Sequence, residues 1–181
     1  MNIYFGHKSI DFDDCEILNN RNFEGREVIR NGRTVNSKGR RNFLIAISPE
    51  QYEELIEKGW DVGQFAPRED GDEATCFIRV NLSYFKAPPK VHYISEGQDT
   101  MLTEEQVSIL DHVNFERVDI RCSEVNKQKQ DGTWVKKPFV MELWATVTPD
   151  RFRNRYEYLN HSEEEDLHDM SGDDSDLPFK A

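Results

Sequence analysis

The chain has 181 residues, of which 36% are hydrophobic, and its formal net charge is −12. This length is enough for one domain with a hydrophobic core and an appended segment. The three cysteines, Cys15, Cys76 and Cys122, are far apart in the sequence, which argues against a disulfide framework or a zinc site, so we expect reduced thiols in a cytosolic protein. No apolar stretch approaches about 18 residues, so we expect no membrane span, and the N-terminus lacks the pattern of a secretory signal.

The negative charge is concentrated near the C-terminus. Residues 160–181 contain eight acids and one base, a net charge of −7, so residues 1–159 carry −5 of the total −12. Two segments of that body are basic: residues 21–41 carry +5 and residues 127–137 carry +3. Salt limits the reach of distant charges to roughly 8 Å at physiological ionic strength, so these segments can bind a phosphate backbone. The distribution predicts a folded domain over residues 1–159 and a disordered acidic tail over residues 160–181.

The first predicted elements are a strand over residues 15–23 and a long, flexible basic loop over residues 24–39, which contains three glycines. A second strand is predicted over residues 40–47 because apolar residues alternate along it. Its inward face would hold Phe43, Ile45 and Ile47. A helix is predicted over residues 48–59, where Ser, Pro and finally Gly occupy the cap, the first position and the end. The apolar face of this helix would consist of Tyr52, Leu55 and Ile56.

The C-terminal part of the body consists mainly of predicted strands. They cover residues 60–65, 76–85, 90–94, 116–125 and 134–147. A capping box over residues 103–106 predicts a second short helix with Val107 and Leu110 facing inward, and Asp131-Gly132 marks the turn of a hairpin between the two long strands. These elements predict a mainly β (α+β) domain, either an oligonucleotide-binding-like small barrel or a half-open sheet with two short helices.

The strand over residues 76–85 separates apolar from polar side chains. Its inner face would consist of Cys76, Ile78, Val80, Leu82 and Tyr84. Its outer face would consist of Phe77, Arg79, Asn81, Ser83 and Phe85. A polar face with two aromatic rings and an arginine can stack the bases of a single strand, at roughly 1–3 kcal/mol per base. The alternative is that Phe77 and Phe85 pack under a loop.

Two basic segments are candidate DNA contacts. The loop within residues 21–41 is interpreted as a clamp that closes over DNA, or as a solvated loop whose arginines pair with Glu24, Glu27 or the acidic tail. The hairpin tip over residues 127–137, with Trp134, is a second candidate finger or ordinary surface. The predicted DNA-binding residues are Arg33, Lys38, Arg40, Arg41, Phe77, Arg79, Phe85, Lys86, Lys90, Tyr93 and Lys136.

The end of the chain combines acidic residues with one apolar hook. The candidate partner-docking residues are Asp173, Asp174, Asp176, Leu177, Pro178 and Phe179. The acids would steer this segment toward basic surfaces, and the leucine and phenylalanine would fill a small pocket; the alternative, a solubilising tail, gains nothing from an exposed phenylalanine. These six residues resemble the C-terminal tip of bacterial and phage single-stranded DNA-binding proteins, with Lys180 and Ala181 added after the phenylalanine. The resemblance implies docking on replication and repair proteins.

The body also resembles phage single-stranded DNA-binding proteins. The similar segments, all within about residues 12–150, are residues 41–45, 59–62, 68–73, 78–82 and 88–91. The resemblance implies a protein that coats transient single strands with little sequence preference during phage replication or recombination, in the cytoplasm of the host cell. It implies no cofactor and no metal, and it leaves self-association open.

Two other functions remain as alternatives. An acidic module that mimics DNA and inhibits a nucleic-acid enzyme would fit the net charge, while the basic loop and the tip of the tail argue against it. A nuclease would need a metal-binding acidic cluster, and no pattern in the sequence selects one. The sequence contains no phosphate-binding loop, zinc-protease, nucleophile-elbow or dinucleotide-binding motif, so we do not expect an enzyme.

Overall fold

The computed structural model describes residues 1–67 and 74–149. Met1–Thr148 form one compact unit and Pro149–Ala181 are divided from it as a second. All described secondary structure belongs to the first unit. The predicted boundary between residues 159 and 160, and the predicted tail, lie outside the described residues.

The described residues form eleven strands, one α-helix and one 3₁₀ helix. The strands are β1 (Asn2–Gly6), β2 (Ser9–Asp13), β3 (Val28–Arg30), β4 (Arg33–Asn36), β5 (Arg41–Ile47), β6 (Val62–Phe65), β7 (Thr75–Leu82), β8 (Lys90–Ser95), β9 (Gln98–Leu102), β10 (Phe115–Gln128) and β11 (Trp134–Val147). The helices are α1 (Pro49–Glu57) and the 3₁₀ helix Val107–Asp111. Within this described part, neither helix is long and apolar enough to cross a membrane.

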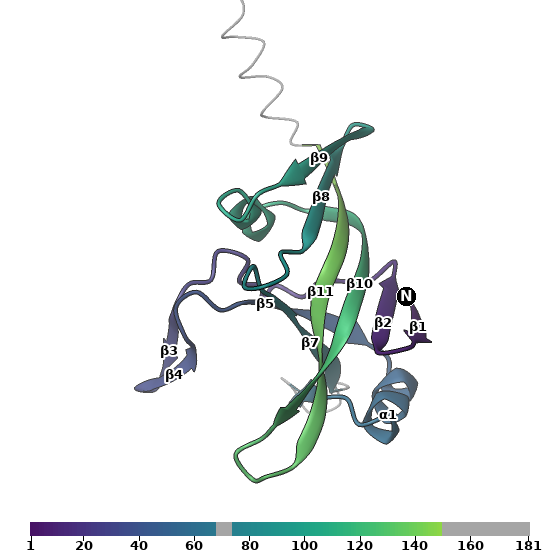
Figure 1. Cartoon of the computed structure of the whole chain (residues 1–181), viewed down its shortest axis with the longest axis vertical. Coiled ribbons are helices and arrows are strands. Elements are labelled where there is room, and N and C mark those ends of the chain that lie inside the picture. The colour runs from purple at the N-terminus through teal and green to yellow at the C-terminus, as the bar shows by residue number, and fades with distance from the viewer. Residues whose placement is uncertain (68–73, 150–181) are drawn as a thin grey trace, which may run out of the picture. The chain divides into compact units, whose positions relative to one another are not determined.

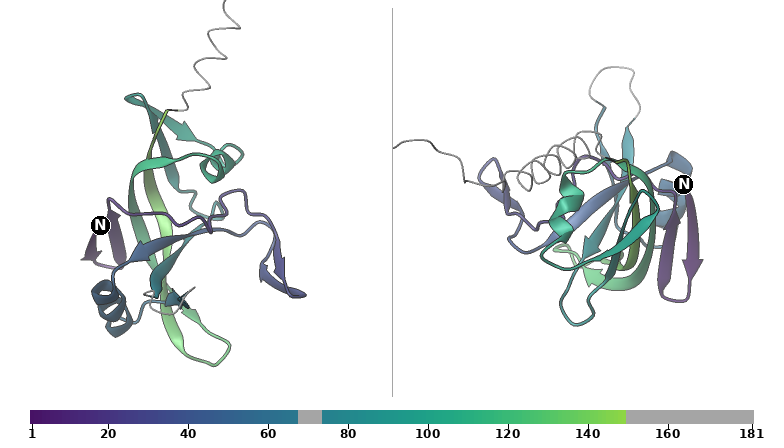
Figure 2. Two further views of the ribbon diagram at one scale, coloured as in Figure 1. Left: turned by 180° about the vertical axis from the view of Figure 1, so that it is seen from behind. Right: turned by 90° about the horizontal axis from the view of Figure 1, so that it is seen from above.

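Nine of the strands form one sheet in the order β1-β2-β10-β11-β7-β5, in which β6 also pairs with β7, and β8 pairs with both β11 and β9. The two longest strands, β10 and β11, pair antiparallel and run side by side through the unit (Figure 1). On its other side, β11 pairs in parallel with β7 and with β8. Strands β3 and β4 form a separate hairpin, which projects away from the large sheet when seen from the front (Figure 1) and from behind (Figure 2).

The large sheet does not close into a barrel. The segment that follows β2, residues 15–22, reaches β5 only through the isolated bridges Ile17–Ile45 and Asn22–Asn42. A barrel requires a continuous hydrogen-bonded ladder where its first and last strands meet. The strand predicted for this segment and the predicted barrel are therefore wrong, whereas the mainly β, open-sheet form of the prediction is confirmed.

The inner face of β5 and β7 lies in the core, as the alternation of their residues predicts. Its buried side chains are Phe43, Ile45, Ile47, Cys76, Ile78, Val80 and Leu82. Tyr84, predicted with them, is partly buried against the same cluster. Phe23 stacks on Phe43 with 4.9 Å between the ring centroids, so the chain that leads into the β3–β4 hairpin is anchored in the core. Each large apolar side chain buried in this way contributes roughly 1.5–3 kcal/mol to folding.

Helix α1 begins after Ser48, the predicted cap, which forms a capping box with Gln51. The Ser48 Oγ accepts a hydrogen bond from the Gln51 amide at 3.2 Å, and the Gln51 Oε1 accepts one from the Ser48 amide at 3.0 Å. Leu55 is fully buried, whereas Ile56, expected on the same face, is 45% exposed. The second predicted helix is the 3₁₀ helix, and its inward residues are, as predicted, Val107 and Leu110.

Hairpin turns account for the main differences from the predicted elements. The segment predicted as a flexible loop contains β3 and β4, whose turn places Asn31 and Gly32 at φ values of +51° and +72°. Asn-Gly is a strong sequence signal for such a turn, and the sequence interpretation passed over it. Glu96 and Gly97 make the equivalent turn between β8 and β9, while β1 and β2 form another hairpin that was not predicted. The predicted turn at Asp131-Gly132 is present, with Gly132 at φ +86°.

Candidate nucleic-acid interface

A groove of about 240 Å³ lies between the outer face of β5 and β7 and the β3–β4 hairpin. We call the hairpin with its two flanking legs, residues 26–40, the arm. The residues that line the groove are Asn19, Asn20, Arg21, Asn22, Val28, Arg30, Val35, Asn36, Asn42, Leu44, Phe65 and Arg79. One wall of the groove therefore comes from the sheet and the other from the arm. A groove with two such walls can hold an extended nucleic-acid strand.

The sheet register brings the polar outer face of β7 into this groove. The outward residues of β7 are Phe77, Arg79 and Asn81. Opposite them on β5 are Ala46, Leu44 and Asn42, respectively. Arg79 and Asn42 line the groove, with Leu44 between the strands as its apolar floor. The predicted outer face of this strand therefore contributes to a concave surface.

An aromatic pair lies on the same outer face. The rings of Phe65 on β6 and Phe77 on β7 have centroids 4.5 Å apart and are tilted by 32°. Gly63 lies opposite Phe77 in the ladder, and a Cβ there would come within 2.6 Å of the Phe77 Cζ. The missing side chain thus lets the Phe77 ring lie across β6 and support Phe65, which is 37% exposed and lines the groove. An exposed ring backed by a second ring is a surface on which a base can stack.

Two arginines face the groove without an ion-pair partner among the described residues. They are Arg30, from the arm, and Arg79, from the sheet, and both are exposed. Arg21 also lines the groove but is fixed by structure: its guanidinium donates to the Val113 carbonyl at 2.7 Å and lies 5.0 Å from the centroid of the Phe115 ring. The two unpaired guanidinium groups on opposite walls are suited to contact a phosphate backbone.

The predicted basic residues of the arm are exposed but do not line the groove. Arg33 lies in β4, and Lys38 and Arg40 lie in the leg that leads to β5. Arg41, by contrast, is half-buried in a contact of its own: it donates to Glu104 at 2.8 Å and lies 5.4 Å from the Tyr84 ring centroid. The structure therefore gives Arg41 a structural partner, and only the other three remain available as charges.

The predicted residues after β7 do not share the lining of the groove. Phe85 is 78% exposed and the Lys86 Nζ lies 5.6 Å from its ring centroid. Lys90 is exposed at the start of β8, whereas Tyr93 packs against the core. Of this group, Phe85 with Lys86 offers an exposed ring and charge, and Tyr93 does not.

Three of the four lysines at the β10–β11 hairpin are paired with acids of the same unit, and the fourth, Lys127, is exposed. Lys129 and Lys137 contact the two oxygens of Asp61 at 2.7 and 3.0 Å, and Lys136 contacts Glu124 at 3.2 Å and lies over the Trp60 ring. Burial alone would raise the pKa of Asp61, but the hydrogen bonds from Lys129 and Lys137 outweigh it and hold this pKa below 3.8. Lys136, predicted to bind DNA, therefore has an intramolecular partner.

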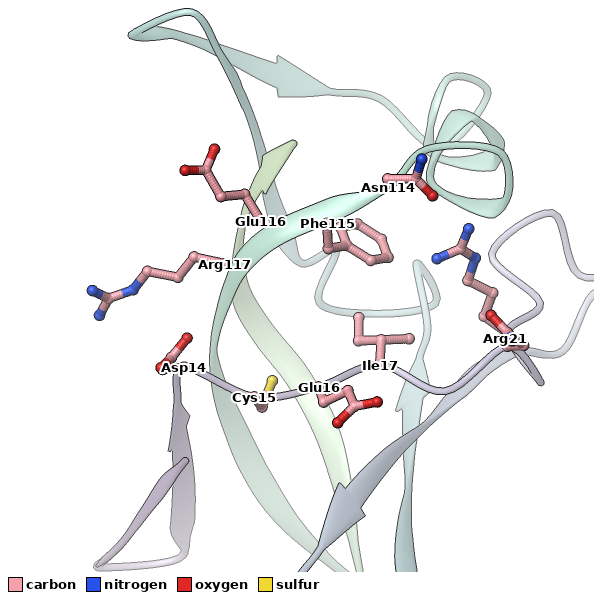
Figure 3. A pocket seen from close by; sticks show the side chains of 10 residues that line it. Asp14, Cys15, Glu16, Ile17, Arg21, Asn114, Phe115, Glu116 and Arg117 are labelled. Atoms are coloured by element: carbon pink, nitrogen blue, oxygen red, sulfur yellow. The ribbon is translucent and has the colours of Figure 1, made fainter. Parts of the chain in front are cut away.

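A second pocket, of about 330 Å³, adjoins the groove and shares Asn19 and Arg21 with it (Figure 3). Ile17 and Phe115 lie between Arg21 at one end and Arg117 at the other (Figure 3). The carboxylates that line it are Asp14, Glu16 and Glu116. Arg117 is bound at 2.8 Å to Asp13 and to Asp119, so its charge is already neutralised. The acidic lining makes this pocket a poor site for a phosphate.

Two of the three buried thiols, Cys15 and Cys122, are held in the protonated form. Burial, reinforced by the nearby Asp119 carboxylate, raises the pKa of Cys15 to about 12. Burial also raises the pKa of Cys122 well above its usual value. Both groups are therefore protonated thiols at neutral pH. In the part of the chain that the structure describes, no group of three or more His, Cys, Asp or Glu side chains could hold a metal ion.

The sequence interpretation missed three contributors to the groove. Phe65 was predicted at the end of a strand but was given no role, because only the pairing of β6 with β7 brings its ring against that of Phe77. Arg30 was counted in the basic loop but not singled out, since the hairpin that aims it was not recognised. The asparagines 22, 36 and 42 carry no sequence signal beyond a turn preference. The predicted docking residues of the tail lie outside the described residues, and their role stays a prediction.

Comparison with known proteins bears on the whole chain. The model of a family described as "Putative phage ssDNA-binding domain" matches residues 2–180. Searches of curated proteins and of solved structures gave no match. The description of the family names binding of single-stranded DNA. With nearly its full length matched, this chain belongs to the phage single-stranded DNA-binding domain family.

Proposed function

We propose that the protein binds single-stranded DNA in the groove between the arm and the outer face of β5 and β7. The observation that supports this most directly is the exposed Phe65 ring, backed by Phe77, in a groove whose two walls carry Arg79 and Arg30, neither of which has an ion-pair partner among the described residues. A base would stack on Phe65, and the two guanidinium groups would contact phosphates on either side. Stacking is sequence-tolerant because every base has a π-face, so binding would show little sequence preference.

The overall charge of −12 does not oppose this assignment. Exposed charges more than about 8 Å away are largely screened at physiological ionic strength, and the arm supplies a local excess of positive charge. Arg33, Lys38 and Arg40 would extend the backbone contact beyond the groove, and Phe85 with Lys86 would form an outlying contact. The basic residues among these would add to the electrostatic part of the affinity rather than to base recognition.

In the infected cell, the protein would coat and protect single strands during phage replication or recombination, in the host cytoplasm. The acidic residues 160–181 would recruit replication or repair proteins. Their Asp-rich end would steer toward a basic surface, and Leu177 and Phe179 would enter an apolar pocket. Binding of a peptide covering residues 170–181 to a candidate polymerase or helicase, lost on Phe179→Ala, tests this part separately.

A binding titration tests the central proposal. The labelled probe is oligo-dT, measured by fluorescence anisotropy over a series of salt concentrations, with the wild type, Arg79→Gln and Lys58→Gln. Lys58 is an exposed lysine of the α1 end, paired with Glu54, and serves as the matched loss of charge outside the groove. We expect affinity to fall as salt rises, with a slope smaller by about 0.7 in Arg79→Gln than in Lys58→Gln.

The same titration distinguishes the proposed function from the alternative of an acidic DNA mimic, which the net charge and the acid-lined second pocket would favour. A mimic binds no oligo-dT even at low salt. Absence of binding at low salt would therefore overturn the proposed function. Equal salt slopes in the two variants would leave DNA binding but remove Arg79 from the site.

A further inference from the structure

Asn36, at the end of β4, holds the two legs of the arm together. Its Nδ2 donates to the carbonyl oxygens of Arg26 and Arg40, both at 2.9 Å, and makes a longer contact of 3.2 Å with that of Ser37. Residue 26 lies on the leg that enters the arm and residue 40 on the leg that leaves it. One side-chain amide thus contacts carbonyls on both legs, and the Arg26 carbonyl also accepts from the Asn22 Nδ2 at 2.7 Å.

A second asparagine, Asn42, links Asn36 to the sheet. The Asn42 Nδ2 donates to the Asn36 Oδ1 at 2.7 Å, and Asn42 lies in β5, where it also lines the groove. Asn22 completes the base of the arm: it exchanges two backbone hydrogen bonds with Asn42, at 2.8 and 3.1 Å, and its Oδ1 accepts from the amides of Gly25 and Arg26. The hydrogen bonds therefore run without a break from the sheet to the arm.

The backbone at the base leaves little freedom for the arm to swing. The Gly39 amide donates to the Gly25 carbonyl at 2.8 Å, and both glycines have φ near +80°. A Cβ on Gly25 would lie 3.2 Å from the Gly39 carbonyl carbon, so the two legs are in direct backbone contact. The arm that carries Arg30 leaves the sheet as a fixed projection rather than as a loose loop.

We propose that Asn36, coupled to the sheet through Asn42, is a positioning residue that holds the arm and Arg30 over the groove. The inference rests on the proposed binding of single-stranded DNA in that groove. A wall that is already in place spares the DNA complex the entropy cost of ordering a loop, and such preorganisation increases affinity without adding a contact. Asn36 itself would touch neither base nor phosphate in this role.

The test variant is Asn36→Asp, which keeps the shape of the side chain but replaces its two N–H donors with an oxygen that faces two carbonyls. The matched control is Asn31→Asp, which adds the same charge to the same arm at its turn, where φ is +51° and aspartate is tolerated. We expect Asn36→Asp to bind oligo-dT about tenfold more weakly than Asn31→Asp, since the change removes the hydrogen bonds to both legs and places a carboxylate oxygen against their carbonyl oxygens. Equal affinities of the two variants would overturn the inference while leaving the proposed function intact.

A double-mutant cycle with Arg30→Gln measures whether the loss of affinity caused by Asn36→Asp depends on Arg30, which a purely structural role of Asn36 would not require. If Asn36 acts by aiming Arg30, most of the loss caused by Asn36→Asp disappears in the Arg30→Gln background. Additive losses would show that Asn36 does not act through Arg30, and would refute the inference. A wild type that binds no oligo-dT at low salt would refute the proposed function itself.

Hydrogen exchange tests the arm without DNA. The amides of Gly25, Arg26 and Gly39 should exchange slowly in the wild type and faster in Asn36→Asp, with the amides of β5 and β7 unchanged. Unchanged protection of these three amides in the variant would contradict the inference. If Asn36→Asp does not fold, Asn42→Ala is tested in its place. This change removes the hydrogen bond from Asn42 to Asn36 and leaves the contacts of Asn36 with the two legs of the arm. Asn42→Ala should also weaken oligo-dT binding.

Discussion

Gly63 has no Cβ, and the Phe77 ring occupies the space that a side chain there would fill on the outer face of β6. The φ of Gly63 is not positive, so its role is to provide room rather than an unusual backbone. The consequence reaches Phe65, whose ring is 4.5 Å from that of Phe77 and lines the groove. One glycine therefore determines how a candidate stacking surface is assembled.

Gly63→Ala should displace the Phe77 ring, because the new Cβ would lie within 2.6 Å of its Cζ. Stacking on an aromatic ring is worth roughly 1–3 kcal/mol per base, so we expect oligo-dT binding to weaken by about tenfold, as in Phe65→Ala. The measurement is anisotropy with oligo-dT, accompanied by thermal unfolding to establish that the variant is folded.

Phe5→Ala is the control for this prediction. Phe5 is an exposed ring on β1, 39% exposed and outside the lining of the groove. Its removal should leave oligo-dT affinity unchanged. A Gly63→Ala protein that binds as tightly as the wild type would exclude the ring pair from the DNA site.

At the scale of elements, the β10–β11 hairpin is joined to the start of β6 by Asp61. This carboxylate accepts from Lys129 and Lys137, and the Asp61 amide donates to the Lys136 carbonyl at 2.9 Å. Two of the four lysines in the predicted DNA-contacting finger, Lys129 and Lys137, thus hold the hairpin against the start of β6. Both of these charges therefore have a partner within the same unit.

The lowered pKa of Asp61 makes this contact dependent on pH. Because the unfolded chain binds the proton more tightly, the stabilisation is fully present above the unfolded pKa of about 3.8 and is lost as pH falls through the lower, folded pKa. We expect Asp61→Asn to lower the free energy of unfolding by about 1–2 kcal/mol at pH 7, and by progressively less below pH 3.8. Urea titrations at neutral and acidic pH measure the difference.

Glu53→Gln, an exposed acid of α1, is the matched control and should change stability little at either pH. If Asp61→Asn is as stable as the wild type at neutral pH, the two lysine contacts contribute nothing to folding. Stronger oligo-dT binding by Asp61→Asn would indicate that the released lysines reach DNA.

At the scale of the whole molecule, charge is separated along the sequence. Residues 160–181 carry −7, whereas the arm and its flanks over residues 21–41 carry +5. The electric field of such an uneven charge distribution changes the rate at which a charged ligand associates with the protein, and this effect weakens steeply as salt rises. The acidic segment is therefore expected to slow the approach of DNA at low salt.

A chain ending at residue 159 should bind oligo-dT roughly tenfold more tightly than the full chain at low ionic strength, and equally at about 1 M salt, where the Debye length is about 3 Å. Stopped-flow association rates measure where the difference arises. The control is a full-length chain in which the three aspartates of the tip, Asp173, Asp174 and Asp176, are replaced by asparagine, and an intermediate effect is expected. Equal binding by all three proteins at low salt would show that the acidic segment does not influence the DNA site.

The elements that could be predicted from the sequence depend on neighbouring residues. Alternation along β5 and β7 predicted which side chains face the core, and Ser48 followed by Pro49 predicted where α1 begins. Asp131-Gly132 predicted the turn of the long hairpin. Each signal is local, since side-chain period, cap and turn chemistry are determined within a few residues of chain. The family resemblance, carried by short segments of sequence, was likewise confirmed.

The groove itself was decided by tertiary structure. Phe65 meets Phe77 only because β6 pairs with β7 in one register, and Arg30 faces Arg79 only because three asparagines hold the arm beside the sheet. The same packing removed predicted ligands, since Arg41 is bound to Glu104 and Lys136 to Glu124. The sequence by itself determined the helix, the family, the division of charge and six of the strands, which are β5, β6, β7, β8, β10 and β11. Long-range pairing decided which aromatic rings and cations remain exposed on one surface, because those contacts join residues that are far apart in the chain.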